Sequence, residues 1–217
     1  YDLAIALKPD DDRAWFGRGS AHAEREYVGQ ARADLKQALA LDASGLGYQG
    51  ELGTLESNAA EWPAAEAAYR AALAANPADY VALTGLGVLD LKRGHPEAAL
   101  ENLLKAGVME PRYARAHVYT AVAYWQLGDR KQAREELARA GEIDDKDPLP
   151  HFMAAMMATD LLAPAEAVDE ARQAMARLPY LKSLNQLAND QQGSANLGQA
   201  FAFMGMEDWA RAYAQAS

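Results

Sequence analysis

Residues 46–79 read LGYQGELGTLESNAAEWPAAEAAYRAALAANPAD, and the main features of this stretch return along most of the chain. Its small residues Gly53, Ala65 and Ala72 and its closing Pro77 each have counterparts at a constant interval of 34 positions. A fixed period of roughly 20 to 50 residues indicates stacked copies of one supersecondary unit. The stretch therefore predicts a repeat protein, in which each unit buries its apolar face against its neighbours.

Four series of residues keep the interval of 34 in phase with one another. They are Ala4, Ala38, Ala72, Ala106, Ala140 and Ala174; Ala31, Ala65, Ala99, Ala133 and Ala167; Gly19, Gly53, Gly87, Ala121 and Ala155; and Pro9, Ala43, Pro77, Pro111, Asp145 and Pro179. Small residues at fixed places on two helices allow those helices to cross closely. Together with apolar residues at helical spacing, the series predict an all-α solenoid of helix pairs.

Proline and glycine mark the turn inside each pair. Pro63, Pro96 and Pro164 stand where the second helix of a repeat begins, a position that tolerates a missing N–H. Gly94 and Gly128 lie at the preceding turn, where we expect a left-handed backbone.

The period also predicts the boundaries. We expect a closing helix of a truncated repeat in residues 1–11, five repeats in 12–181, an insertion in 182–190 and a divergent, incomplete sixth repeat in 191–217. The alanine due at position 201 is best matched by Ala210, and this delay locates the insertion. Because the pattern begins in mid-helix and stops in mid-repeat, we expect the chain to be part of a longer protein.

These residues resemble the tetratricopeptide repeat family, in its bacterial form. The family pattern is seen as Trp15, Gly19, Ala31, Leu35 and Ala38, and again as Leu52, Gly53, Ala65, Tyr69, Ala72 and Pro77. The resemblance implies a right-handed superhelix of antiparallel helix pairs, whose concave face is lined by the first helices and binds peptides or partner proteins. The family has no common catalytic activity.

The resemblance also implies which residues face the groove, namely the second, fifth, ninth and twelfth of each repeat. For the third to fifth repeats the predicted partner-binding residues are Val81, Thr84, Val88, Leu91, Arg115, Val118, Val122, Trp125, Phe152 and Met156. Most of them are apolar, and a monomer rarely exposes so large an apolar patch. Two interpretations follow: a groove that receives an amphipathic helix or an apolar segment, anchored by Trp125, or a core formed by tight closure or self-association.

Composition narrows the class of partner. The chain has 31 acidic and 21 basic residues, a net charge of −10, and no cysteine. This balance argues against sequence-independent nucleic-acid binding and against adhesion to anionic membranes. No stretch is apolar enough for direct membrane insertion. We therefore expect a protein or peptide partner; homo-oligomer formation and the compartment, periplasmic or cytoplasmic, stay open.

No arrangement of residues predicts catalysis, a cofactor or a metal. His117 and His151 lie one period apart, where packing and hydrogen bonding are the expected roles. Asp144, Asp145 and Asp147 resemble a fragment of a calcium loop but lack its glycine and closing glutamate. The sequence therefore predicts that the chain is not an enzyme.

The predicted function is a protein-interaction scaffold. The alternative is a structural periplasmic segment of an outer-membrane or polysaccharide-export assembly. Its motivation is a loose similarity of residues 183–198 and 208–213 to the ends of such segments.

Overall fold

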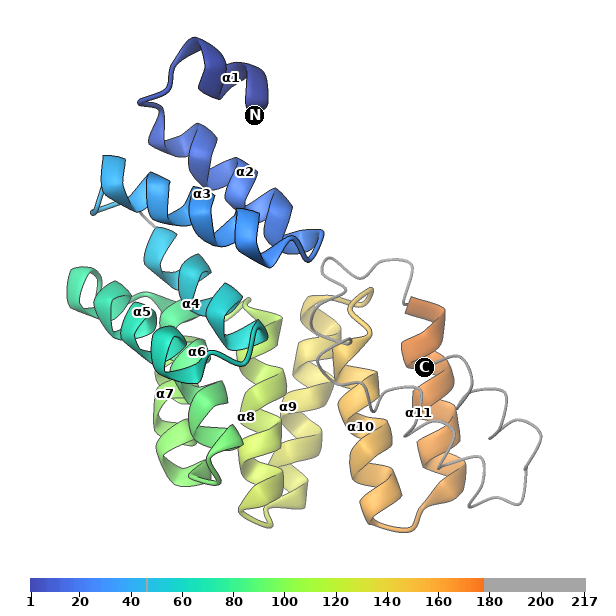
Figure 1. Cartoon of the computed structure of the whole chain (residues 1–217). Helices are drawn as coiled ribbons and strands as arrows, with labels where there is room; N and C mark the ends of the chain where they lie inside the picture. The colour runs from blue at the N-terminus through green and yellow to red at the C-terminus, as the bar shows by residue number, and fades with distance from the viewer. Residues whose placement is uncertain (46, 178–217) are drawn as a thin grey trace. The chain divides into compact units, whose positions relative to one another are not determined.

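The computed structural model describes residues 1–45 and 47–177, which form eleven α-helices and no strand (Figure 1). The predicted all-α class is confirmed within these residues. The expected insertion at 182–190, the expected sixth repeat at 191–217 and the stretches 183–198 and 208–213 lie outside them.

The chain divides into two compact units, Tyr1–Pro111 and a second that begins at Arg112. The first unit contains α1 (Asp2–Leu7), α2 (Asp12–Glu24), α3 (Val28–Leu41), α4 (Tyr48–Asn58), α5 (Trp62–Ala75), α6 (Tyr80–Lys92) and α7 (Pro96–Met109). The second contains α8 (Ala114–Gln126), α9 (Arg130–Ile143), α10 (Leu149–Asp160) and α11 (Pro164–Arg177).

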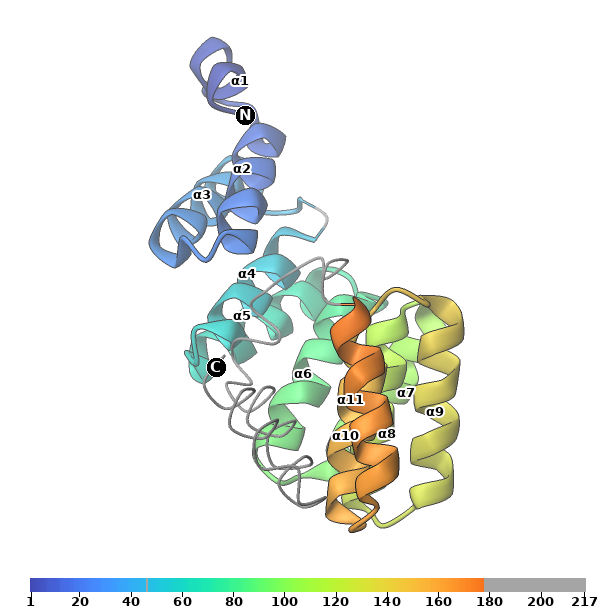
Figure 2. The same ribbon diagram turned by 90° about the vertical axis from the view of Figure 1, so that its right-hand side faces the viewer.

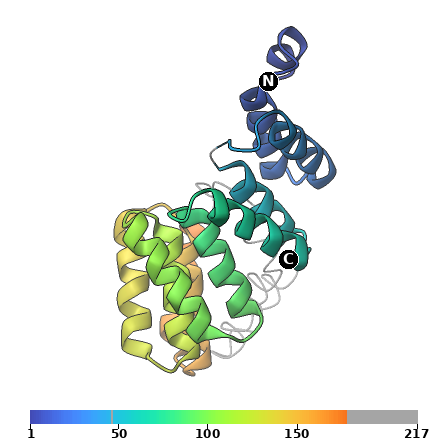
Figure 3. The same ribbon diagram turned by 90° about the vertical axis from the view of Figure 1, so that its left-hand side faces the viewer.

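Each even-numbered helix packs against the helix that follows it in the chain. The pair α2/α3 is seen in blue in Figure 3, and α8 to α11 lie side by side in the second unit in Figure 1, whereas Figure 2 views the same unit with α11 in front. The even-numbered helices are thus the first helices of the repeats, and the odd-numbered helices from α3 onward are the second.

Glycines on the first helices allow this close packing. A Cβ atom on Gly87 of α6 would lie 2.6 Å from Cγ of Leu103 on α7, and one on Gly19 of α2 would lie 3.0 Å from Cγ of Leu35 on α3. Both leucines are completely buried. The periodic small residues therefore leave room for the large residue that fills the contact between the two helices.

Within the described residues, the turn from each even-numbered helix to the odd-numbered helix paired with it uses a left-handed backbone. Gly94 and Gly128 have φ values of 75° and 83°, as predicted. The same turn position is held in the other repeats by residues with side chains: Glu26 (φ 63°), Ala60 (φ 60°) and Leu162 (φ 55°). The left-handed conformation is energetically unfavourable for these three residues, because their Cβ atom crowds the backbone.

Side-chain caps and prolines fix where the helices begin. Asp11 and Asp79 each accept a hydrogen bond from the backbone N–H three residues later, at the starts of α2 and α6. Such caps satisfy N–H groups that the first turn of a helix leaves without a partner. Pro63, Pro96 and Pro164 lie in the first turn of α5, α7 and α11, as predicted.

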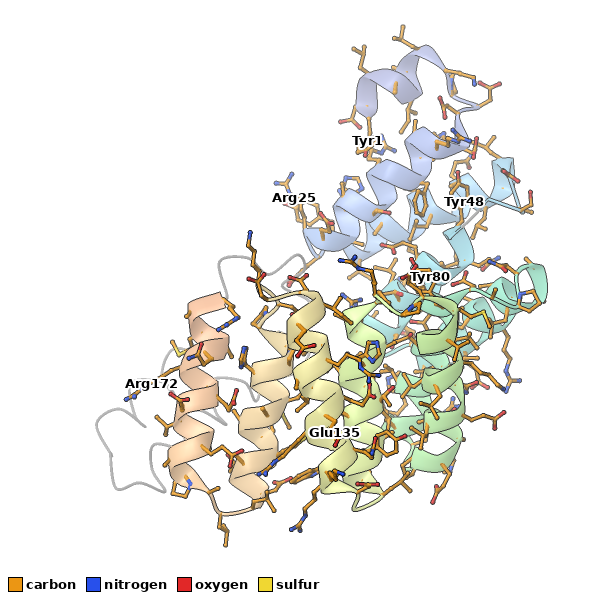
Figure 4. The ribbon with its side chains drawn as sticks, turned by 180° about the vertical axis from the view of Figure 1, so that it is seen from behind. Tyr1, Arg25, Tyr48, Tyr80, Glu135 and Arg172 are labelled. Atoms are coloured by element: carbon orange, nitrogen blue, oxygen red, sulfur yellow. The ribbon has the colours of Figure 1, made fainter. Side chains whose placement is uncertain are left out.

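Polar contacts also join successive repeats in the first unit. Nε and Nη2 of Arg32 on α3 donate to the buried carboxylate of Glu56 on α4, each at 2.6 Å. Tyr48, labelled at the start of α4 in Figure 4, stacks on Phe16 and donates its hydroxyl to Asp12. Burial and this hydrogen bond raise the pKa of Tyr48 to about 12. These contacts set α4 against the preceding pair.

Candidate functional site

The predicted residues of the second unit come together on α8 and α10, the first helices of their repeats. Val118 and Phe152 belong to one buried apolar cluster, and Val122, Trp125 and Met156 pack against it. Residues one period apart, such as Val122 and Met156, hold the same place on the two helices. Apolar residues repeated at the same place on α8 and α10 thus form one continuous strip across the two helices.

The strip has a buried base, formed by Val118 and Phe152, and a partly exposed rim, formed by Val122, Trp125 and Met156. Val118 is 0% exposed and Phe152 is 4% exposed, so both contribute to the interior of the unit. Val122, Trp125 and Met156 are partly exposed, and Arg115 is partly exposed at the beginning of α8. The surface that solvent reaches is therefore smaller than the predicted one, and its largest side chain is Trp125.

Two polar neighbours hold the Trp125 ring. Its indole N–H donates to Oδ2 of Asp160 at the end of α10, at 3.3 Å. The Arg130 guanidinium lies 5.8 Å from the ring centroid, within the range of a cation–π contact. An oriented aromatic ring on an apolar rim is the kind of side chain that dominates binding energy at protein interfaces.

The predicted residues of the first unit all lie on α6. Thr84 and Leu91 are buried, at 3% and 7% exposure, and the Thr84 hydroxyl donates to the backbone oxygen of Tyr80 at 2.7 Å. Val81 and Val88 are partly exposed. Binding of a partner by these α6 residues, and by those of α8 and α10, stays a prediction.

The two histidines noted in the sequence each pair with a glutamate on the second helix of the same repeat. Nδ1 of His117 lies 2.6 Å from Oε2 of Glu136, and Nδ1 of His151 lies 2.7 Å from Oε2 of Glu170. The expected packing and hydrogen bonding of these histidines are confirmed. Sequence reasoning missed the glutamates, although both follow their histidine at the same offset and stand one period apart.

A cleft of about 450 Å³ lies among α9, α10 and α11, and no pattern in the sequence predicted it. Its lining includes Arg134, His151, Glu166, Glu170 and Arg177. These groups already pair across the cleft: His151 with Glu170, Arg134 with Glu166 at 3.3 Å, and Arg177 with the backbone oxygen of Asp145 at 2.8 Å. These three contacts therefore join α11 to α9, to α10 and to the turn between them.

Other polar groups have local structural partners. Oδ1 of Asp144 accepts from the N–H of Lys146, and Oδ1 of Asp147 accepts from the N–H of Leu149, so both carboxylates stabilise the turn before α10. Within residues 1–45 and 47–177, no group of three His, Asp or Glu side chains is placed to hold a metal ion. No helix in the same part of the chain is both long and apolar enough to cross a bilayer.

Comparison with known proteins agrees with this architecture. Residues 86–148 match the family model described as tetratricopeptide repeat. A search of curated proteins found no match. Among solved structures, PilF of Pseudomonas aeruginosa is 19% identical, with a TM-score of 0.66, over 95% of this chain and 90% of PilF.

Two further structures are similar over most of their length. A thermophilic tetratricopeptide repeat protein of Thermus thermophilus is 18% identical, with a TM-score of 0.72, over 86% of this chain and 98% of that protein. YrrB, described as a tetratricopeptide repeat protein with an unusual peptide-binding site, is 18% identical, with a TM-score of 0.53, over 82% of this chain and 92% of YrrB. At these identities the likeness shows the fold.

Proposed function

Because this chain is a tetratricopeptide repeat protein, we propose that it is a protein-interaction scaffold that binds a peptide or a partner helix through the apolar rim of α8 and α10. The observation that carries the proposal is the partly exposed set Val122, Trp125 and Met156, which rests on a buried base. Because the aromatic ring is already held by the buried residues below it, less side-chain entropy is lost when a partner binds.

The rim favours an amphipathic partner. Val122 and Met156 supply aliphatic contact, and the flexible thioether of Met156 adapts to side chains of different shape. Trp125 adds a flat apolar surface, and Asp160 and Arg130 beside it offer a carboxylate and a guanidinium to the polar side of a bound helix. On α6, Val81 and Val88 extend the proposal to the first unit as a second apolar surface.

The chain has no sequence feature of a catalytic site, and the proposed role requires none. Binding through the faces of paired helices uses apolar contact area and a few oriented polar groups. An acidic chain with net charge −10 also favours partners that carry basic residues around their apolar side.

The test compares partner capture by the wild type with capture by Trp125→Glu. The matched control is Trp62→Glu, which removes a tryptophan that is 39% exposed on α5 and is not among the predicted site residues. All three proteins must show the same helical circular dichroism signal. The proposal expects a partner that is kept by the control and lost by Trp125→Glu.

Two results would contradict it. A partner retained by Trp125→Glu would show that binding does not use the α8/α10 rim. A partner lost equally with both variants would show that binding follows general apolar exposure and has no defined site. A partner identified by mass spectrometry can then be shortened to its binding segment and titrated against both variants.

A further inference from the structure

Helix α7 carries an exposed apolar stripe that the packing of the first unit does not use. Leu104 is 46% exposed and Val108 is 73% exposed, and Leu100, one turn before Leu104, is partly exposed. The three side chains recur at every fourth position, so they follow one side of the helix. The buried residues of α7 are instead Ala99, Leu103 and Ala106.

The stripe is a departure from the repeat pattern, because the other repeats carry mostly charged or small residues at these three places. The counterparts of Leu100 are Arg32, Glu66, Arg134 and Val168; those of Leu104 are Lys36, Arg70, Ala138 and Arg172; and those of Val108 are Ala40, Ala74, Glu142 and Ala176. A requirement of repeat packing would recur in every unit. A cluster of large apolar residues in one unit indicates a contact specific to that unit.

We propose that α7 is a self-association surface, on which a second copy of this chain docks its own α7 in an antiparallel arrangement. A two-fold axis beside Leu104 would place the two Leu104 side chains together. It would also place Leu100 of each copy against Val108 of the other. Such an interface is isologous, so one patch must be complementary to itself.

The charges beside the stripe satisfy this condition. Nζ of Lys105 lies 2.6 Å from Oε1 of Glu101, one turn earlier on the same helix, and both side chains are well exposed. In an antiparallel pair, Glu101 of each copy comes within reach of Lys105 of the other, so the two-fold axis creates two such ion pairs. A protein of unrelated charge pattern, or a copy bound in the parallel orientation, would not place opposite charges against both Glu101 and Lys105. The charge pattern therefore favours a second, antiparallel copy of this chain as the partner.

The size of the surface sets the expected strength. A helix of 14 residues is about 21 Å long, and one helix face buries much less than the roughly 800 Å² per partner of a standard stable interface. The association is therefore weak and reversible, with a dissociation constant of about 10–100 μM. It shares no residue with the proposed rim of α8 and α10, so either proposal can fail without the other.

The chain has no cysteine, so a single introduced cysteine reports contact directly. In Leu104→Cys, the two sulfurs meet near the two-fold axis, and mild oxidation should give a covalent dimer at least tenfold faster than in Arg70→Cys. Arg70 is the counterpart of Leu104 in the preceding repeat, and its side chain is 73% exposed. Equal rates in the two variants would overturn the proposal.

Sedimentation equilibrium supplies an independent readout without a cross-link. The double variant Leu104→Arg/Val108→Ala takes both residues from the preceding repeat, where Arg70 and Ala74 hold these places in the same fold. The wild type should show a monomer–dimer equilibrium, and the double variant should weaken it at least tenfold. A wild type that stays monomeric up to about 500 μM, or a dimer unchanged by the double variant, would overturn the proposal.

Discussion

Replacing Gly85 with alanine tests how tightly the repeats of the first unit are packed. A Cβ atom on Gly85 of α6 would overlap the ring of Tyr69 on α5, at Cζ, Cε1 and Cε2. The ring cannot retreat toward α4, the first helix of its own repeat, because a Cβ on Gly53 of α4 would also lie only 2.6 Å from it. Tyr69 is 3% exposed and is therefore held between glycines of two successive first helices.

The expected magnitude is the difference between two effects. Forcing an extra methyl group into a well-packed contact costs about 1–3 kcal/mol. Alanine in the interior of a helix is favoured over glycine by about 1 kcal/mol. Gly85→Ala should therefore lower the free energy of unfolding by up to about 2 kcal/mol.

Gly50→Ala on α4 is the matched control. A Cβ there would lie 3.6 Å from Oδ2 of Asp79 and 3.7 Å from Cγ1 of Val81, which are ordinary contact distances. Only the helix-propensity gain remains, so this variant should be more stable than the wild type by about 0.5–1 kcal/mol. The same chemical change thus has opposite signs at two glycines in one unit.

The assay is urea unfolding followed by circular dichroism at constant temperature. A double variant, Tyr69→Leu/Gly85→Ala, completes the cycle, since leucine holds the position of Tyr69 in three other repeats as Leu35, Leu103 and Leu137. Its loss of stability should be smaller than the sum of the two single losses by about 1 kcal/mol. Gly85→Ala as stable as Gly50→Ala would refute the confinement of the ring.

Three further predictions concern the turns, a tyrosine and an ion pair. Ala60→Gly should raise the free energy of unfolding by about 1 kcal/mol and Gly94→Ala should lower it by about the same amount, because both positions have a left-handed backbone. A change of the same sign in both variants, measured by urea unfolding, would contradict this. Burial raises the pKa of Tyr48 to about 12, whereas the unfolded phenol ionises near its ordinary value of about 10. The stabilisation from the neutral phenol is therefore complete below pH ~10 and is lost as the pH rises toward ~12, by roughly 3 kcal/mol; the difference in stability between wild type and Tyr48→Phe, measured at steps of pH, should follow this loss, and a constant difference would disprove it. Arg32→Met leaves the Glu56 carboxylate buried without its cation and should cost about 1–3 kcal/mol, and adding Glu56→Leu should recover most of it; no recovery in the double variant would mean that the arginine acts through packing alone.

The periodic pattern predicted the helices and their turns because its residues act locally. Proline in the first turn and glycine at a left-handed turn each follow from backbone geometry, so Pro96 and Gly94 could be read from the sequence alone. The same turn conformation at Glu26, Ala60 and Leu162 could not, since residue preference points away from it there. The surrounding helix pair imposes that conformation, and only the repeat interval could have indicated it.

The candidate site shows a different limit of prediction from the sequence, which concerns how deeply each residue is buried. The positions implied by family resemblance specify a face of the first helix and give no depth on that face. Val118 and Trp125 occupy such positions on α8, yet one is completely buried and the other reaches solvent. Val118 is a short side chain inside the cluster that contains Phe152 of α10, whereas Trp125 lies in the last turn of α8 and packs against that cluster while staying partly exposed. Side-chain size and place along the helix therefore decide which residues a partner can contact.

Side-chain size also links the repeats to one another, in a way that a single repeat does not show. Where the second helix carries Leu35 or Leu137, the place of Gly85 in the next repeat holds the larger residues Glu51 and Met153. Where it carries Tyr69, that place holds Gly85 itself, and the structure shows the ring occupying the space of the missing side chain. At this junction the large ring of Tyr69 is thus matched by the missing side chain of Gly85, because an interior packed to crystal density tolerates neither a void nor an overlap. The fit between Tyr69 and Gly85 therefore joins two successive repeats, and we expect it to be lost if either repeat were moved to another place in the chain.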